Sequence, residues 1–256
     1  IKPSLVLMAD QQSNASLIHH SDGIRIRFER HISPRQGEWE ENNTGWHLVS
    51  SPVEQQAVGG MWAPEGDFRY EFQMWDEEEQ LWVLELEDNS HEMDYFIKGR
   101  GYRLAYEEET VNSFDGHGII SDIEDIRVSK SGDDQQYGWN LLGNPFTSSL
   151  TWKDHNWSLG PDVGSIAKLW NSEYQSYTDL LPGGIIPSTS GFFIYYGPGH
   201  KSVSSLTIPS ASRIHKPYQQ NDPGRTTLSD PEHIKLTAHD HDKGSMQELI
   251  LRFSDD

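Results

Sequence analysis

The sequence predicts an all-β protein: two tandem, internally repeated copies of one antiparallel, β-sandwich-like module, with further β-segments at both ends. Two observations carry this prediction. Apolar and polar residues alternate along many short segments, and three blocks of sequence recur in the same order at nearly constant spacing. A third supports them, because no segment reads as an amphipathic helix of three turns.

Alternation of apolar and polar side chains is typical of a strand with one buried face. Residues 24–29 show it, with Ile26 and Phe28 flanked by Arg25, Arg27 and Glu29. The same pattern occurs at 68–74, 82–87, 234–238 and 249–253. Clusters of Gly, Pro, Asp and Ser, such as 131–134 and 181–184, separate these segments and predict turns.

The internal repeat sets the expected domain organisation. Residues 45–53 align with 138–146, 74–82 with 169–177 and 101–106 with 191–196. The offsets, taken at Trp46 and Trp139, Trp75 and Trp170, and Gly101 and Gly191, are 93, 95 and 90 residues. We expect four regions: 1–30 as the end of an upstream β-region, 31–131 as the first module, 132–215 as the second, and 216–256 as a linker and the start of a third β-unit.

Composition excludes several classes of protein. The formal net charge is −20, which argues against nucleic acid as a partner because phosphate binding needs a basic face. The chain has no cysteine, so disulfides and thiol chemistry are excluded. No apolar run is long enough to insert in a membrane. It opens at Ile1 without a signal peptide, and we expect it to be part of a longer polypeptide.

A further set of segments carries a resemblance to a known group of proteins: 15–20, 30–32, 45–52, 99–106, 138–145 and 186–195. These segments resemble the extracellular region of large Bacteroidetes surface proteins that are exported by the type nine secretion system. Residues 206–209, with 233–238 and 249–253, resemble the β-segment that follows there. The sorting domain of those proteins is absent here. The resemblance implies a secreted or outer-membrane-attached protein that meets the secretion machinery during export.

Tryptophans divide into two groups. Trp46, Trp75, Trp139 and Trp170 recur in both copies, so we expect them to be mostly buried in a shared core. Four aromatic residues without a repeat counterpart lie in polar, turn-rich sequence and are the candidate ligand-binding residues: Trp39, Trp62, Trp157 and Tyr174. Aromatic rings there would stack on the apolar faces of sugars.

The sequence contains no motif that indicates a metal site or a catalytic centre. The run 239–242 (His-Asp-His-Asp) reads as a solvated hairpin turn, so no metal site is assigned. A structural calcium ion on Asp122, Glu124 and Asp125, or on Asp133 and Asp134, is the one cofactor considered, but no calcium-loop spacing is present. No catalytic motif occurs, so no catalytic residue is named and the chain is expected not to be an enzyme.

The expected function is that of a non-catalytic extracellular module in adhesion or glycan binding. One alternative is a structural spacer of an exported protein, and another is part of a secreted glycan-degrading enzyme. The expected partner is an extracellular glycan or surface polymer that is neutral or cationic, since a net charge of −20 repels polyanions. Arg25, Arg27, Arg30 and Arg35 form the one basic cluster that would change this expectation.

Overall fold

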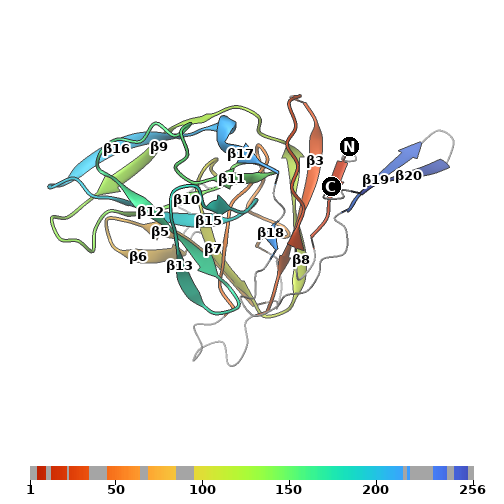
Figure 1. Cartoon of the computed structure of the whole chain (residues 1–256). Coiled ribbons are helices and arrows are strands. Elements are labelled where there is room, and N and C mark those ends of the chain that lie inside the picture. The colour runs from red at the N-terminus through yellow and green to blue at the C-terminus, as the bar shows by residue number, and fades with distance from the viewer. Residues whose placement is uncertain are drawn as a thin grey trace. The chain divides into compact units, whose positions relative to one another are not determined.

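The computed structural model describes residues 5–9, 13–21, 23–34, 45–63, 69–84, 95–215, 218–219, 233–240 and 245–252. Every regular element in these residues is a strand, apart from the 3-10 helix η1 (Ser210–Ser212), so the predicted all-β class is confirmed (Figure 1). The chain forms two compact units, Ile1–Gln219 and Gln220–Asp256. Among the described residues there is no helix that could cross a membrane.

Two four-stranded antiparallel sheets organise the first unit. The first has the order β4 (His47–Val49), β7 (Tyr102–Tyr106), β5 (Tyr70–Asp76) and β6 (Leu81–Leu84). The second has the order β10 (Trp139–Gly143), β15 (Gly191–Tyr196), β12 (Val163–Asn171) and β13 (Ser176–Leu180). In each copy the strand of the first sequence block therefore pairs with that of the third, which pairs in turn with that of the second.

Aligned residues also share a register. Trp75 lies opposite Trp82 across β5 and β6, and Trp170 lies opposite Tyr177 across β12 and β13. The pairings of β4 with β7 and of β10 with β15 correspond in the same way. The equivalent positions thus point to the same face of their sheets, because successive side chains in a strand alternate between faces.

The hairpin turns of the two copies are duplicates as well. Oδ1 of Asp76 accepts hydrogen bonds from the backbone N–H groups two and three residues further on, at 2.8 and 3.1 Å. Oδ1 of Asn171 does the same at 2.9 and 3.0 Å. Each turn ends on a glutamine with positive φ, 56° at Gln80 and 49° at Gln175. The short polar side chain therefore holds the turn in both copies.

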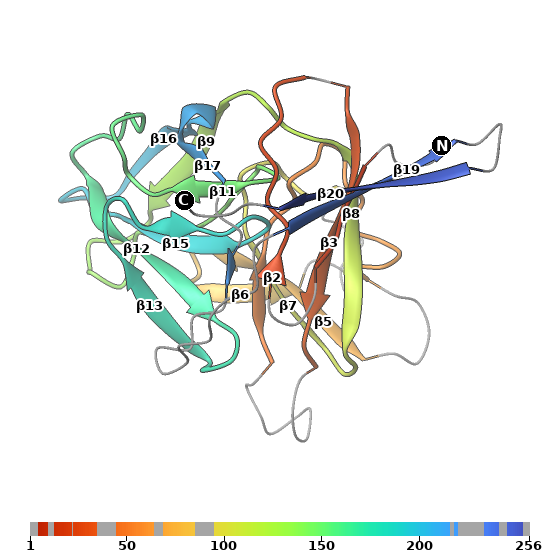
Figure 2. The ribbon, with the colours of Figure 1, turned by 45° about the vertical axis from the view of Figure 1, so that its right-hand side comes forward.

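An outer pair of antiparallel strands completes each copy. It consists of β3 (Arg25–Ile32) and β8 (Thr110–His117) in the first copy, and of β9 (Ile123–Lys130) and β16 (Ser202–Ile208) in the second. Figure 2 shows β3 and β8 on the right of the ribbon and the hairpin of β12 and β13 on the left.

The predicted module boundaries shift accordingly. β9 was expected in the first module, but it pairs with β16, and its Ile126 and Val128 belong to the core of the second copy. The first copy begins at β3, six residues before the expected start at residue 31. The aligned blocks start only at Gly45 and Gly138, so they could not mark the outer strand that precedes each of them.

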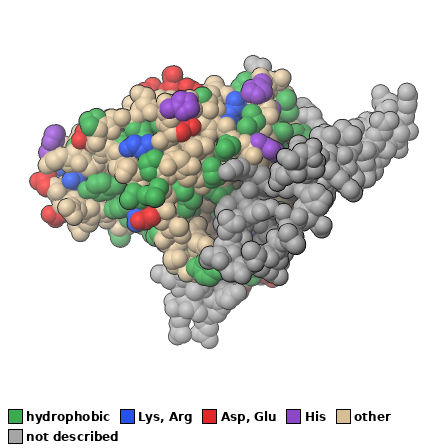
Figure 3. All heavy atoms as spheres, viewed as in Figure 1, with side chains coloured by type: hydrophobic (Ala, Val, Ile, Leu, Met, Phe, Trp, Pro, Cys, Tyr) green, Lys and Arg blue, Asp and Glu red, His purple; other side chains and the backbone are tan. Residues whose placement is uncertain are grey.

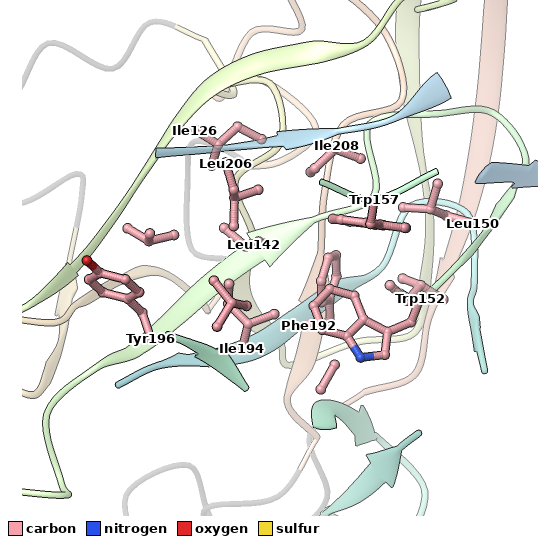
Figure 4. Close-up of a cluster of buried hydrophobic side chains, with 14 of the residues drawn as sticks. Ile126, Leu142, Leu150, Trp152, Trp157, Phe192, Ile194, Tyr196, Leu206 and Ile208 are labelled. Atoms are coloured by element: carbon pink, nitrogen blue, oxygen red, sulfur yellow. The ribbon is translucent and has the colours of Figure 1, made fainter. Parts of the chain in front are cut away.

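Each copy has its own hydrophobic core. The first contains Phe28, Trp62, Phe72 and Phe114, and the second contains Trp152, Phe192 and Ile194. In the second core, Ile126 and Leu206 from the outer strands cover Leu142 and Ile194 of the four-stranded sheet (Figure 4). The outer strands therefore close one face of each four-stranded sheet, and the opposite face is left for other contacts.

Short strands complete the first unit. β1 (Leu5–Leu7) runs parallel to β3, β11 (Ser149–Thr151) lies between β14 (Ile185–Ile186) and β17 (Arg213–Ile214), and β2 (Ser13–Asn14) pairs with β18 (Tyr218–Gln219). In the second unit, β19 (His233–Asp240) and β20 (Ser245–Arg252) form an antiparallel hairpin. This hairpin contains the predicted strand at 234–238 and residues 249–252 of the predicted strand at 249–253, while Phe253 lies outside the described residues.

Candidate functional site

The two four-stranded sheets meet through the faces that their cores leave free. The residues of this contact, called the aromatic seam below, are Leu48, Leu141, Phe193, Trp75, Trp82, Trp139 and Trp170. In β15 the alternation is plain, because Phe193 lies in the seam while Phe192 and Ile194 lie in the second core. A strand that is apolar on both faces is expected where it is covered on both sides.

Reciprocal hydrogen bonds cross the seam. The indole Nε1–H of Trp75 donates to the backbone carbonyl of Trp139 at 2.7 Å, and that of Trp170 donates to the carbonyl of Trp46 at 2.6 Å. The two bonds are equivalent under the repeat. Trp46 is buried as expected, whereas Trp75, Trp139 and Trp170 are only partly buried, because they serve the contact between the copies and not one shared core.

Backbone contacts repeat the same exchange. Val49 bridges to Ser190, and its equivalent Leu142 bridges to Arg100. Glycine permits this approach, since a Cβ added to Gly101 would lie 2.5 Å from the carbonyl oxygen of Leu142. The two copies are therefore joined by a contact in which each contributes the same groups, the arrangement expected of a two-fold interface.

A pocket of about 220 Å³ opens on the seam. Its lining comes from both copies and consists of Trp75, Gln80, Trp82, Trp139, Lys168, Tyr177 and Phe193. Five of these seven residues are aromatic. Concave, aromatic sites with a few polar groups are the usual form of small-ligand sites in proteins.

Phe193 lies among the aromatic walls. Its ring centroid is 5.6 Å from that of Trp75, 5.9 Å from that of Trp82 and 5.8 Å from that of Tyr177. All three contacts are edge-on, which is a favoured arrangement for aromatic pairs. Interlocked rings of this kind hold the walls in fixed positions.

The polar groups lie on two different elements. Lys168, on β12, forms an ion pair with Asp179 of the neighbouring β13, and its Nζ lies 6.0 Å from the ring centroid of Trp139. An ammonium group has three N–H donors, so the ion pair does not exhaust its capacity. Gln80 belongs to the turn between β5 and β6 and adds an amide. The pocket thus offers aromatic faces beside hydrogen-bonding groups.

The aromatic residues proposed from the sequence lie elsewhere. Trp62 is 0% exposed in the first core and stacks on Phe114 at 4.3 Å, and its indole N–H donates to the carbonyl of Ser113. Trp157 is 8% exposed in the second core beside Trp152, and its N–H donates to the carbonyl of Thr151 (Figure 4). Both rings face the interior, which corrects the expectation that they form a ligand platform.

Tyr174 is 53% exposed in the turn between β12 and β13, and it is not among the residues that line the pocket. Trp39 lies outside the described residues. The structure therefore does not bring Trp62, Trp157 and Tyr174 together. Polar, turn-rich sequence was a poor guide, because a large ring in a loop lowers its free energy by folding back onto the core beneath it.

Sequence reasoning missed the pocket because two of its tryptophans, Trp75 and Trp139, recur in both copies and were assigned to the core. The signal that could have revealed it is a difference between the copies. Phe193 stands where the first copy has Arg103, and Lys168 stands where it has Gln73. The two exchanges lie directly opposite each other on neighbouring strands, because Lys168 pairs with Phe193 and Gln73 pairs with Arg103. They mark a place where the two copies differ in chemistry.

Other polar clusters make contacts within the protein. Arg25 and Arg27 both pair with Asp115 at 3.0 Å, so one carboxylate offsets part of the positive charge of the predicted basic strip. Asp122 accepts two hydrogen bonds from Ser210, which lower the pKa of its carboxyl group. The described residues contain no group of three metal-binding side chains, and His241 and Asp242 lie outside them.

Among the described residues, Ser33 and His47 form a serine–histidine pair. Ser33 Oγ lies 3.0 Å from Nε2 of His47, and Nδ1 of His47 is buried without a partner. Burial, with the nearby charge of Arg30, lowers the pKa of His47 to about 3. A nucleophile–base pair ordinarily has a third group that orients the base, and no such group contacts Nδ1.

In comparisons with known proteins, no family model, no curated protein and no solved structure matches this chain. The resemblance to exported Bacteroidetes surface proteins accordingly stays a prediction.

Proposed function

We propose that this chain is a non-catalytic binding module whose pocket on the aromatic seam holds one ring of a neutral carbohydrate. The observation that carries the proposal is the lining of that pocket, five aromatic residues beside Lys168 and Gln80. The apolar face of a sugar ring stacks on aromatic faces, while its hydroxyl groups need hydrogen-bonding partners at the edge.

Charge favours a neutral ligand over an anionic one. The net charge is −20, and on the face drawn in Figure 3 the Lys and Arg side chains are scattered, some of them beside Asp or Glu. A polyanion would meet a repulsive field, and the pocket lining offers one basic side chain, Lys168, to offset it. Lys168 is already paired with Asp179, so the pocket itself carries little net charge.

Such a module would act in adhesion or glycan binding at a cell surface or in the secreted protein to which it belongs. A spacer is the second candidate. The reciprocal indole hydrogen bonds between the copies favour it, because they join the two modules into one rigid body, as a spacer requires.

Carbohydrate binding is tested on the chain itself. A glycan array would identify ligands, and calorimetry would measure their affinity for the wild type, for Trp139→Ala and Lys168→Met, and for Tyr174→Ala as the control. We expect each pocket variant to weaken binding by about tenfold or more, because each removes a direct contact. Binding to no glycan, or equal loss in the control, would favour the spacer.

A further inference from the structure

The pocket has an equivalent place in the first copy. The repeat relates Trp139 to Trp46, Phe193 to Arg103, Lys168 to Gln73, and Tyr177 to Trp82. These positions have the same places in sheets of the same strand order. The side chain that occupies this position in the first copy can therefore be compared with the pocket in the second copy.

In the first copy the place is filled by Arg103. Its guanidinium carbon lies 3.9 Å from the ring centroid of Trp46 and 4.1 Å from that of Trp82, so the group is held between two indoles. Nε of Arg103 donates a 2.8 Å hydrogen bond to Oε1 of Gln73, and NH2 donates to the same oxygen. A planar cation is thus stacked and hydrogen-bonded as a bound ligand would be.

In the second copy the corresponding ring, Trp139, is approached less closely. Lys168 lies 6.0 Å from its centroid, against 3.9 Å for Arg103 over Trp46. Phe193, which stands in the place of Arg103, makes its ring contacts with Trp75, Trp82 and Tyr177. Trp139 lines the pocket together with Tyr177, and these two residues are the equivalents of Trp46 and Trp82, which hold the guanidinium in the first copy.

We propose that the seam holds two copies of one aromatic binding site. Arg103 fills the first site, and the second site is open because Phe193 stands in the place of Arg103. The proposal rests on the proposed function and adds to it that the chain binds one ligand and not two. It also narrows the ligand chemistry. The acceptor Gln73 is replaced by the donor Lys168, so the ligand presents an acceptor, such as a hydroxyl oxygen, where Arg103 presents N–H donors.

Exchange of the differing residues tests this proposal. Arg103→Phe with Gln73→Lys gives the first site the residues of the second, and Phe193→Arg with Lys168→Gln does the reverse. Binding is titrated by calorimetry with the methyl glycosides of glucose, galactose, mannose and N-acetylglucosamine. We expect the first pair to raise the stoichiometry from one to two, and the second pair to abolish binding. A stoichiometry that stays at one in the first pair, with the fold intact by circular dichroism, would overturn the proposal.

A second measurement does not depend on carbohydrate. Arg103→Ala removes the guanidinium and leaves both indoles, and methylguanidinium chloride should then raise the melting temperature of this variant above that in equal sodium chloride. Wild type, whose site is filled, and Trp46→Ala with Arg103→Ala, which lacks one wall, should show no such gain. If no glycoside binds but this rescue occurs, the proposed carbohydrate function fails and the closed site stands. Absence of rescue would overturn the inference about Arg103.

Discussion

The indole N–H of Trp75 donates a 2.7 Å hydrogen bond to the backbone carbonyl of Trp139, and so joins the second sequence block of one copy to the first block of the other. Trp170 and Trp46 form the equivalent bond in the opposite direction. The two copies of the module therefore bind each other through equivalent groups, because each copy supplies one indole donor and one carbonyl acceptor.

Loss of either indole hydrogen bond should destabilise the first unit. Trp75→Phe and Trp170→Phe keep an aromatic ring and leave a carbonyl in the seam without its donor, so we expect each to cost about 1–3 kcal/mol. Urea unfolding followed by circular dichroism measures this free energy. Tyr174→Phe, in an exposed turn, should change it by less than about 0.5 kcal/mol. Equal free energies of unfolding for all three variants would show that the indole hydrogen bonds do not stabilise the first unit.

The close backbone approach at Gly101 should not tolerate a methyl group. A Cβ there would lie 2.5 Å from the carbonyl oxygen of Leu142, and backbone cannot move aside as a flexible side chain can. We expect Gly101→Ala to cost about 1–3 kcal/mol, the usual range for overpacking. Gly160→Ala is the matched control, because no atom lies within 4 Å of its added Cβ. Thermal unfolding of the two variants would decide, and a smaller loss at Gly101 than at Gly160 would contradict the expected clash.

The buried tryptophans of the two cores should be the costliest to remove. Trp62 and Trp152 are both 0% exposed, and we expect Trp62→Ala and Trp152→Ala to cost about 3–5 kcal/mol each. Trp46→Ala, at 4% exposed, belongs to the same class. Denaturant unfolding gives the free energies. A loss below about 1 kcal/mol at any of the three would argue against its role in the interior.

Acid should destabilise the protein through His47. Its pKa is lowered from 6.5 to about 3 in the folded state, chiefly by burial, so the unfolded chain binds the proton more readily. The contribution of His47 is therefore complete above pH 6.5 and is lost as the pH falls toward 3, with a slope approaching about 1.4 kcal/mol per pH unit. Unfolding measured from pH 7 to pH 4 in wild type and His47→Gln should show a shallower slope in the variant. The exposed His155→Gln should keep the slope of the wild type, and identical slopes in all three would refute the assignment.

Much of the fold could be predicted from local pattern. Ile26 and Phe28 are buried and Arg27 is exposed, as their alternation predicts, because a strand turns successive side chains to opposite faces. The aligned Trp75 and Trp170 also lie at the same register in sheets of the same order. Strand β9 was assigned to the wrong copy. Its pairing with β16 joins residues about eighty apart in the sequence, and no local pattern in either segment indicates which strand it pairs with.

The sequence by itself determined the all-β class, the turns at Asp76 and Asn171 and the correspondence between the blocks, because these depend on residue type and on spacing along a strand. Only the tertiary structure decided which tryptophans are interior and which form a site. Trp62 and Trp139 are the same residue type, yet one stacks on Phe114 in a core and the other borders a pocket. The physical reason is that burial depends on what covers a side chain, and here the cover on Trp46 is Arg103, which the second copy does not have.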